Sequence, residues 1–106
     1  MIVGTFAWLW GAPAYVTSIA NLVPQVELDF FGHLERGEIE AARNIVVEYE
    51  TPFFEAIGPY GWHEGLHAAL KVFGLPAGGL RLPLVAPPAS YERSLETRFK
   101  EIGLLK

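Results

Sequence analysis

The first 26 residues contain no charged side chain, and Glu27 is the first charged residue of the chain. An uncharged run of this length is either buried inside a protein or placed in a membrane. Gly4, Gly11, Pro13 and Pro24 interrupt the run and would break a membrane-spanning helix, and no Lys or Arg lies near its start to orient one. We therefore predict no membrane segment, but a stretch buried on both faces, as the strands of parallel sheets are.

Within this run, a short β-favouring stretch leads directly into the start of a helix. The stretch is Tyr15-Val16-Thr17, and small polar residues follow it. Asn21 is suited to cap the helix that follows, and Pro24 is suited to its first turn, where the missing N–H costs nothing. The pattern predicts a strand that feeds an amphipathic helix, which is the β-to-α joint repeated in α/β folds.

The joint resembles a known family. Tyr15 to Pro24 is similar to the last strand and following helix of the dihydrodipicolinate synthase / N-acetylneuraminate lyase family, whose members are (β/α)8-barrel lyases that bind pyruvate-type substrates through a lysine Schiff base. Residues 67–75 resemble the penultimate helix of that family, and residues 81–85 resemble its Arg-aliphatic-Pro-aliphatic segment. A whole barrel takes about 250 residues. The resemblance therefore implies a C-terminal third, with the last strand or strands and helix of a TIM barrel in residues 1–36 and a C-terminal helical region in residues 37–106.

Hydrophobic periodicity and helix-ending residues predict a mainly α chain with one or two short strands before residue 20. Four helices are expected, over residues 22–36, 38–57, 62–73 and 90–102. Pro52 lies inside the second of these and is expected to kink it or to leave a carbonyl unpaired. Ser90 is expected to cap the last helix.

Composition limits the partners. The net charge of −4 gives no reason to expect nucleic acid, and the absence of cysteine excludes disulfides and thiol catalysis. This composition fits a cytoplasmic protein, and no cofactor is expected. Three large aromatic residues within residues 6–10 need an apolar surface to cover them, which predicts a homo-oligomer or association through exposed apolar surface.

The resemblance also implies where a substrate would bind. Side chains at the carboxyl ends of barrel strands build the site of a TIM-barrel enzyme. In the intact enzyme, the main chain at Val16, together with Ser18, is expected to approach a pyruvate-type 2-oxo acid. Gly4 and Thr5 correspond to the glycine-containing turn after the preceding strand.

No catalytic residue is expected in this chain. The Schiff-base lysine of the family lies on an earlier barrel strand, whereas Lys71, Lys100 and Lys106 are the only lysines here and fall on predicted helices or at the C-terminal end. The chain is therefore interpreted as a portion of a Schiff-base-forming lyase that is not catalytic alone. The sequence does not identify the substrate of the parent enzyme.

One motif suggests an alternative function. His63-Glu64-Gly65-Leu66-His67 matches H-E-x-x-H, which on a helix places two histidines on one face as zinc ligands and a glutamate as general base. This would make the chain a small zinc-dependent hydrolase. A third ligand is needed, and Leu70 and Phe73 occupy the positions at which one common extension of the motif has Gly and His. The other interpretation is a partly exposed helix N-terminus with Glu64 favourably placed toward the helix dipole.

The other polar residues of the long helices have no predicted chemistry. His33 is expected to have a surface or packing role. Six carboxylates are expected on solvated helix faces: Glu35, Glu38, Glu40, Glu48, Glu50 and Glu55.

Overall fold

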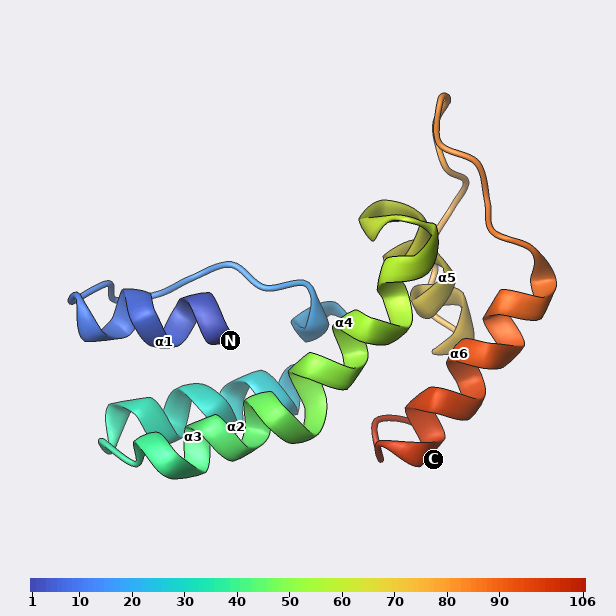
Figure 1. The fold of residues 1–106 in the computed structure, drawn as a ribbon. Helices are drawn as coiled ribbons and strands as arrows, with labels where there is room; N and C mark the ends of the chain where they lie inside the picture. The colour runs from blue at the N-terminus through green and yellow to red at the C-terminus, as the bar shows by residue number, and fades with distance from the viewer. The chain divides into compact units, whose positions relative to one another are not determined.

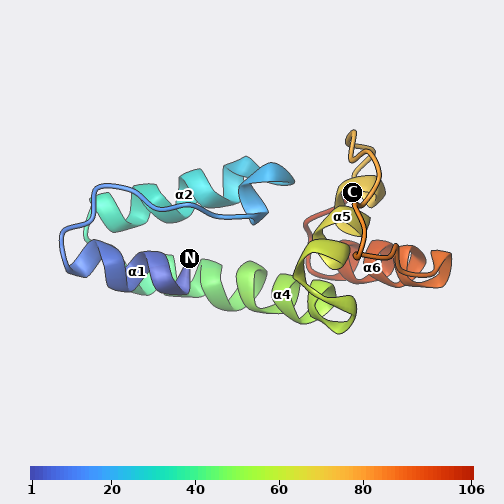
Figure 2. The same ribbon diagram turned by 90° about the horizontal axis from the view of Figure 1, so that it is seen from above.

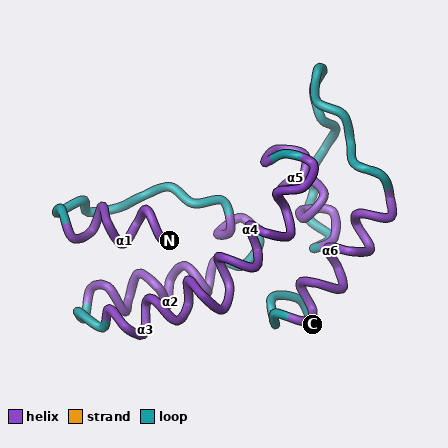
Figure 3. Tube along the Cα trace, in the orientation of Figure 1, coloured by secondary structure: helices purple, strands orange, loops and turns teal.

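The computed structural model describes residues 1–106, and it contains helices and loops but no β-strand (Figures 1 and 3). The chain forms two compact units. Unit 1 comprises Met1–Thr51 and unit 2 comprises Pro52–Lys106. None of the helices is long and apolar enough to cross a membrane.

Unit 1 is built from three helices. α1 (Ile2–Leu9) is followed by a loop that leads through the short helix η1 (Ile19–Asn21) into α2 (Pro24–Glu35) (Figure 2), and α3 (Ile39–Ile45) runs back along α2 (Figure 1). Gly37, with a φ of 73°, makes the turn between α2 and α3. The apolar core of the unit consists of Met1, Ile19, Leu22, Phe30, Leu34, Ala42 and Val46.

A π-helical turn lies inside the long helical stretch that starts with α3. The turn is η2 (Val46–Glu50), and α4 (Thr51–Ile57) continues directly from it. The Thr51 N–H bonds to the Val46 carbonyl, five residues back, immediately before Pro52. Because proline has no N–H and its ring clashes with the carbonyl four residues earlier, a wider turn at this point accommodates it. The disturbance expected at Pro52 thus takes the form of a π turn.

Unit 2 is a helix pair with an aromatic core. After α4 come η3 (Gly58–Tyr60), α5 (Trp62–Val72) and α6 (Ala89–Glu101), and α5 packs on α6. The rings of Phe53 and Phe99 stack with centroids 5.7 Å apart. A Cβ on Gly65 would lie 1.9 Å from the Ile57 carbonyl oxygen, so glycine is required where α5 crosses the end of α4.

The predicted helices are confirmed within a few residues of their ends. Three local predictions are wrong. No strand forms before residue 20, because residues 2–5 belong to α1 and residues 14–17 have no regular secondary structure. Asn21 does not cap α2: the capping position is Val23, no side chain caps the helix, and Asn21 Nδ2 donates to the Ser18 carbonyl. Ser90 lies within the first turn of α6 and makes no cap hydrogen bond.

The missing strands have a physical explanation. A strand is held by hydrogen bonds to neighbouring strands, and no backbone hydrogen bond involves residues 14–17 of this chain. A β-favouring sequence without a neighbouring strand therefore stays irregular. The proposed boundary between barrel portion and helical region, at residues 36 and 37, describes a parent enzyme and stays a prediction.

Candidate functional site

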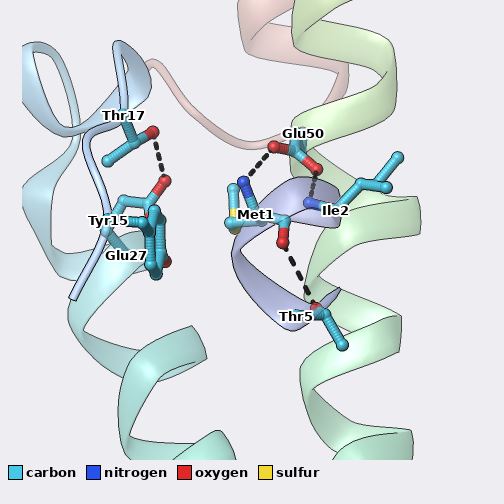
Figure 4. Close-up of polar contacts among 7 residues, drawn as sticks. All are labelled: Met1, Ile2, Thr5, Tyr15, Thr17, Glu27 and Glu50. Atoms are coloured by element: carbon cyan, nitrogen blue, oxygen red, sulfur yellow. Dashed lines mark hydrogen bonds and ion pairs between the residues drawn. The ribbon is translucent and has the colours of Figure 1, made fainter. Parts of the chain in front are cut away.

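One of the two buried carboxylates of unit 1 is that of Glu27, in the first turn of α2. Its side chain is only 7% exposed. One carboxylate oxygen accepts a hydrogen bond from the Tyr15 hydroxyl at 2.5 Å, and the other accepts one from Thr17 Oγ1 at 2.6 Å (Figure 4). We call these three residues the Glu27 cluster. Two short hydroxyl-to-carboxylate bonds tie the loop after α1 to α2.

The rest of unit 1 holds Tyr15 in place. Gly4 of α1 lies directly against its ring, because a Cβ at that position would be 2.9 Å from the nearest ring carbon. On its α2 side the ring meets Phe30 edge-on, with centroids 6.0 Å apart, and Phe31 at 6.2 Å. The phenol is therefore packed between α1 and α2, with its hydroxyl directed at Glu27.

This environment keeps Tyr15 protonated. Burial raises the pKa of the Tyr15 hydroxyl well above its ordinary value, and the hydrogen bond and negative charge of Glu27 raise it further, with a smaller contribution from Glu50. A neutral phenol is a hydrogen-bond donor, which is what a buried carboxylate needs from its neighbours.

A second buried carboxylate, Glu50, lies in the π turn. It is 2% exposed, and it bonds to the α-ammonium group of Met1 and accepts a hydrogen bond from the Ile2 N–H at 2.8 Å (Figure 4). The prediction that Glu50 lies on a solvated face is therefore wrong, while the other five carboxylates of that group are exposed as predicted. The α-helical stripe through Val46 and Phe53 passes position 50, which explains its burial.

A shallow hollow of about 350 Å³ opens beside the Glu27 cluster. Apart from the three cluster residues its walls are apolar: Ala14, Ala20, Pro24, Leu28 and Phe31. Both Glu27 oxygens are already engaged by hydroxyl donors, and the cluster contains no amine, thiol or imidazole. The arrangement can position a loop and offer an apolar surface, but it provides no nucleophile of the kind that Schiff-base chemistry requires.

The four predicted substrate-binding residues have different environments in the structure. Val16 is fully exposed, and Ser18 has a buried Oγ with no hydrogen-bond partner. Gly4 is covered by the Tyr15 ring, and Thr5 Oγ1 donates to the Met1 carbonyl at 3.2 Å. The assignment of substrate contacts to these positions stays a prediction about an intact enzyme.

The H-E-x-x-H residues lie at the start of α5 in unit 2. His67 Nε2 is 2.8 Å from the Ala77 carbonyl oxygen, an interaction in which this ring nitrogen is the donor. Glu64 folds back toward Gly61, with a carboxylate oxygen 2.6 Å from where a Cβ would stand. No group of three or more metal-ligating side chains occurs in the structure. The geometry is that of a helix N-terminus with one histidine anchored to the following loop.

The three lysines lie outside the Glu27 cluster. Lys71 on α5 pairs with Glu92 at 3.4 Å, and Lys100 on α6 pairs with Glu96 at 2.7 Å. Both side chains are about half exposed, and Lys106 is exposed at the end of the chain.

Comparison with known proteins identifies relatives over almost the whole chain. The chain is 30% identical to a 4-hydroxy-tetrahydrodipicolinate synthase from Corynebacterium aurimucosum over 92% of its own length and 33% of that protein. A synthase of the same name from Methanocaldococcus jannaschii is 30% identical over 90% of the chain and 32% of that protein. The chain is similar to one third of a dihydrodipicolinate synthase.

The family resemblance of the sequence is thereby confirmed. An uncharacterised DapA-like lyase from Halobacterium salinarum also matches, at 31% identity over 90% of the chain and 31% of its own length. The chain thus spans about a third of the length of the dihydrodipicolinate synthases it matches. No protein-family model and no solved structure matches the chain. Relatives named as synthases and lyases give the zinc-hydrolase alternative no support.

Sequence reasoning missed Glu27, although a signal for it was present. Glu27 follows Val23 by four residues and precedes Phe30 by three, so it falls on the apolar face predicted for this helix. It is also the first charge after a long uncharged run. A lone carboxylate on an apolar face needs buried hydrogen-bond donors. Tyr15 and Thr17, in the loop before α2, supply them.

Proposed function

We propose that this chain is the C-terminal portion of a Schiff-base-forming lyase that acts on pyruvate-type 2-oxo acids, and that it is not catalytic alone. The observation that carries the proposal is the match to dihydrodipicolinate synthases over about 90% of the chain but only a third of their length. The two thirds of these relatives that the chain does not match are where such an enzyme would keep its reacting lysine. A cytoplasmic location is part of the same proposal.

The loop of residues 14–17 supports this proposal. It carries β-favouring residues, and its backbone makes no hydrogen bond within the chain. Such a segment is suited to become a barrel strand once neighbouring strands supply the ladder. In that setting the main chain at Val16 and the unpartnered Ser18 hydroxyl would be free to face the substrate. The proposed substrate contacts of Gly4 and Thr5 have less support, because the Tyr15 ring covers Gly4 and Thr5 Oγ1 donates to the Met1 carbonyl.

The lysines of this chain are poorly placed for the chemistry. In Schiff-base formation a neutral amine attacks the carbonyl carbon of the oxo acid, and the carbonyl oxygen leaves as water. A solvated lysine side chain, with an ordinary pKa of about 10.4, is almost wholly protonated at neutral pH. Lys71 and Lys100 are about half exposed and paired with Glu92 and Glu96, so neither lies in an apolar pocket of the kind that activates a lysine.

The test is adduct formation. The chain would be incubated with pyruvate, reduced with borohydride to convert any imine to a stable secondary amine, and analysed by intact-mass spectrometry. We expect no stoichiometric adduct on the chain alone. When the N-terminal two thirds of a relative such as the Corynebacterium aurimucosum synthase is supplied, we expect one adduct, on a lysine of the supplied portion.

Two controls make the result specific. Lactate has a hydroxyl in place of the carbonyl and should give no adduct in either arrangement. Lys71→Arg keeps the positive charge but removes the amine that pairs with Glu92 of α6. This substitution should leave the amount of adduct unchanged in both arrangements. A single stoichiometric adduct mapped to a lysine of the isolated chain would overturn the proposal.

A further inference from the structure

A hollow of about 360 Å³ lies between α5 and the loop that follows it in unit 2. We call it the α5 hollow. One side is a single face of α5, because residues three and four apart on a helix are neighbours. The residues of that face are His63, Leu66, His67 and Leu70, and residues between 79 and 84 of the loop line the other side. Both histidines of the H-E-x-x-H motif thus border a space that an organic molecule can enter.

Two interactions hold the loop side of the α5 hollow in position. His67 Nε2 donates to the Ala77 carbonyl at 2.8 Å, which fixes the loop soon after it leaves α5. Further along, the Leu84 N–H bonds to the Arg81 carbonyl at 3.0 Å and closes a turn. The hollow is therefore formed before any ligand arrives, and a ligand does not bear the cost of ordering this segment.

The walls of the α5 hollow are mainly apolar. Four leucine side chains are partly buried around it, two from α5 and two from the loop: Leu66, Leu70, Leu80 and Leu84. Its volume is at the lower end of the range of about 300–1,000 Å³ in which proteins bind small molecules. The size and the lining therefore suit a ligand with a short apolar chain.

The polar groups beside these leucines favour an anion. Arg81 is exposed and takes part in none of the ion pairs of the structure. His63, on the opposite side, offers a ring N–H as a second donor. No carboxylate lines the hollow, and Glu64 folds back toward Gly61. A guanidinium with no carboxylate partner, next to an imidazole, binds a carboxylate group well.

We propose that the α5 hollow binds a small monocarboxylate with a short apolar chain. The carboxylate lies on the guanidinium of Arg81 and the ring of His63, and the chain lies on the four leucines. The inference concerns unit 2 alone and does not depend on the lyase assignment. It also gives the two histidines of the motif separate roles, with His67 holding the loop and His63 contacting the ligand.

The experiment titrates the full chain with octanoate, up to about 10 mM, and records amide shifts by NMR. We expect saturable shifts at residues 63–70 and 79–84. From butanoate through hexanoate to octanoate, the affinity should rise about two- to fourfold with each added methylene group, because each one is removed from water. Octan-1-ol, which lacks the charge, and octylamine, which reverses it, should both bind more weakly than octanoate.

Two arginine variants test the role of charge. Arg81→Gln should weaken octanoate binding about three- to tenfold, since it removes a charge-assisted hydrogen bond. Arg93→Gln is the matched control. Arg93 lies on α6 of unit 2, is exposed and also takes part in no ion pair, but it does not line the hollow. The same loss of charge at this position should leave the affinity unchanged.

A third variant tests the apolar walls. Leu84→Ala removes part of the loop side and should reduce the gain in affinity per methylene group, while butanoate should bind nearly as it does to the wild-type chain. Leu84 is partly exposed and lies in a loop, and both arginines are exposed. The dispersion of the amide signals checks that each variant is folded.

Several outcomes would overturn the proposal. They are an absence of saturable shifts with octanoate, shifts centred on residues of unit 1, and equal weakening by the two arginine variants. Octan-1-ol that binds as tightly as octanoate would show that the carboxylate contributes nothing. Inorganic phosphate that binds as tightly as octanoate would show that the leucines contribute nothing, and it would overturn the assignment of an apolar chain.

Discussion

At the scale of single residues, unit 1 is organised around two buried carboxylates that use different partners. Glu27 is satisfied by two hydroxyls, and Glu50 by an ammonium group and a backbone N–H. Burying a carboxylate without donors is costly, so each one fixes the position of the segment that supplies its donors. Glu27 holds the loop of residues 14–17 against α2, and Glu50 holds the start of α1 against the π turn.

We expect Glu27→Ala to destabilise unit 1 by about 2 kcal/mol, because it leaves the Tyr15 and Thr17 hydroxyls without their acceptor. Glu35→Ala is the matched control: Glu35 lies on the same helix and is exposed, so the free energy of unfolding should change by less than about 0.5 kcal/mol. Urea unfolding measures both. Equal effects of the two substitutions would show that the Glu27 cluster contributes nothing to stability.

The raised pKa of Tyr15 gives a prediction for alkaline pH. The folded state holds the phenol proton at pH values where the unfolded chain, with an ordinary tyrosine pKa of about 10, releases it. The unfolded state then binds fewer protons, so this group lowers stability as pH rises above about 10 and has no effect on the pH dependence below that value.

Unfolding by urea from neutral pH to about pH 11 tests the Tyr15 prediction. Tyr15→Phe should be less stable than wild type at neutral pH, and the difference should shrink above about pH 10, where wild type loses the contribution of the phenol. Tyr60→Phe, at an exposed position, should run parallel to wild type. A constant difference between Tyr15→Phe and wild type at all pH values would contradict the assignment.

At the scale of elements, the four main helices could be predicted because their signals are local. Apolar spacing identifies the buried face of α2, Pro24 marks its start and Gly37 follows its end, and each of these signals depends only on nearby residues of the chain. The strands could not be predicted in the same way, since pairing depends on neighbours that the sequence of this chain does not supply. The composition of residues 14–17 favours a strand, but the segment has no regular secondary structure.

The Glu27 cluster shows the same division between local and distant information. That Glu27 lies on the buried face of α2 follows from the spacing of apolar residues around it. That Tyr15 and Thr17 are its partners depends on how the loop after α1 folds back, which no local pattern states. The substrate positions implied by the family were inferred from resemblance to a strand, and their roles stay a prediction about an intact enzyme.

Amide hydrogen exchange should distinguish the irregular loop from the helices around it. Because the amides of residues 15–17 have no backbone acceptor, we expect them to exchange at nearly unprotected rates, while the amides around Phe30 and Leu34 on buried α2 exchange far more slowly. Protection of residues 15–17 equal to that of α2 would show that the segment is paired in solution. Slowing of this exchange by the N-terminal portion of a relative would agree with strand formation in an intact barrel.

At the scale of the whole molecule, the chain consists of two compact units, each with its own core. Unit 1 contains the two buried carboxylates, Glu27 and Glu50, whereas unit 2 has an aromatic core around Phe53 and Phe99. The resemblance to a third of a dihydrodipicolinate synthase extends over both units. Each unit has a tryptophan packed against one of its own aromatic side chains: Trp8 contacts Phe31 in unit 1, and Trp62 contacts Phe54 in unit 2.

This distribution allows the two units to be followed separately during unfolding. In Trp62→Phe the fluorescence reports only unit 1, and in a double variant with Trp8→Phe and Trp10→Phe it reports only unit 2. We expect Glu27→Ala to lower the urea midpoint seen in Trp62→Phe, because the Glu27 cluster belongs to unit 1. The midpoint seen in the double variant should be unchanged by Glu27→Ala. Coincident transitions that respond equally to Glu27→Ala in both backgrounds would show instead that the chain unfolds as one cooperative body.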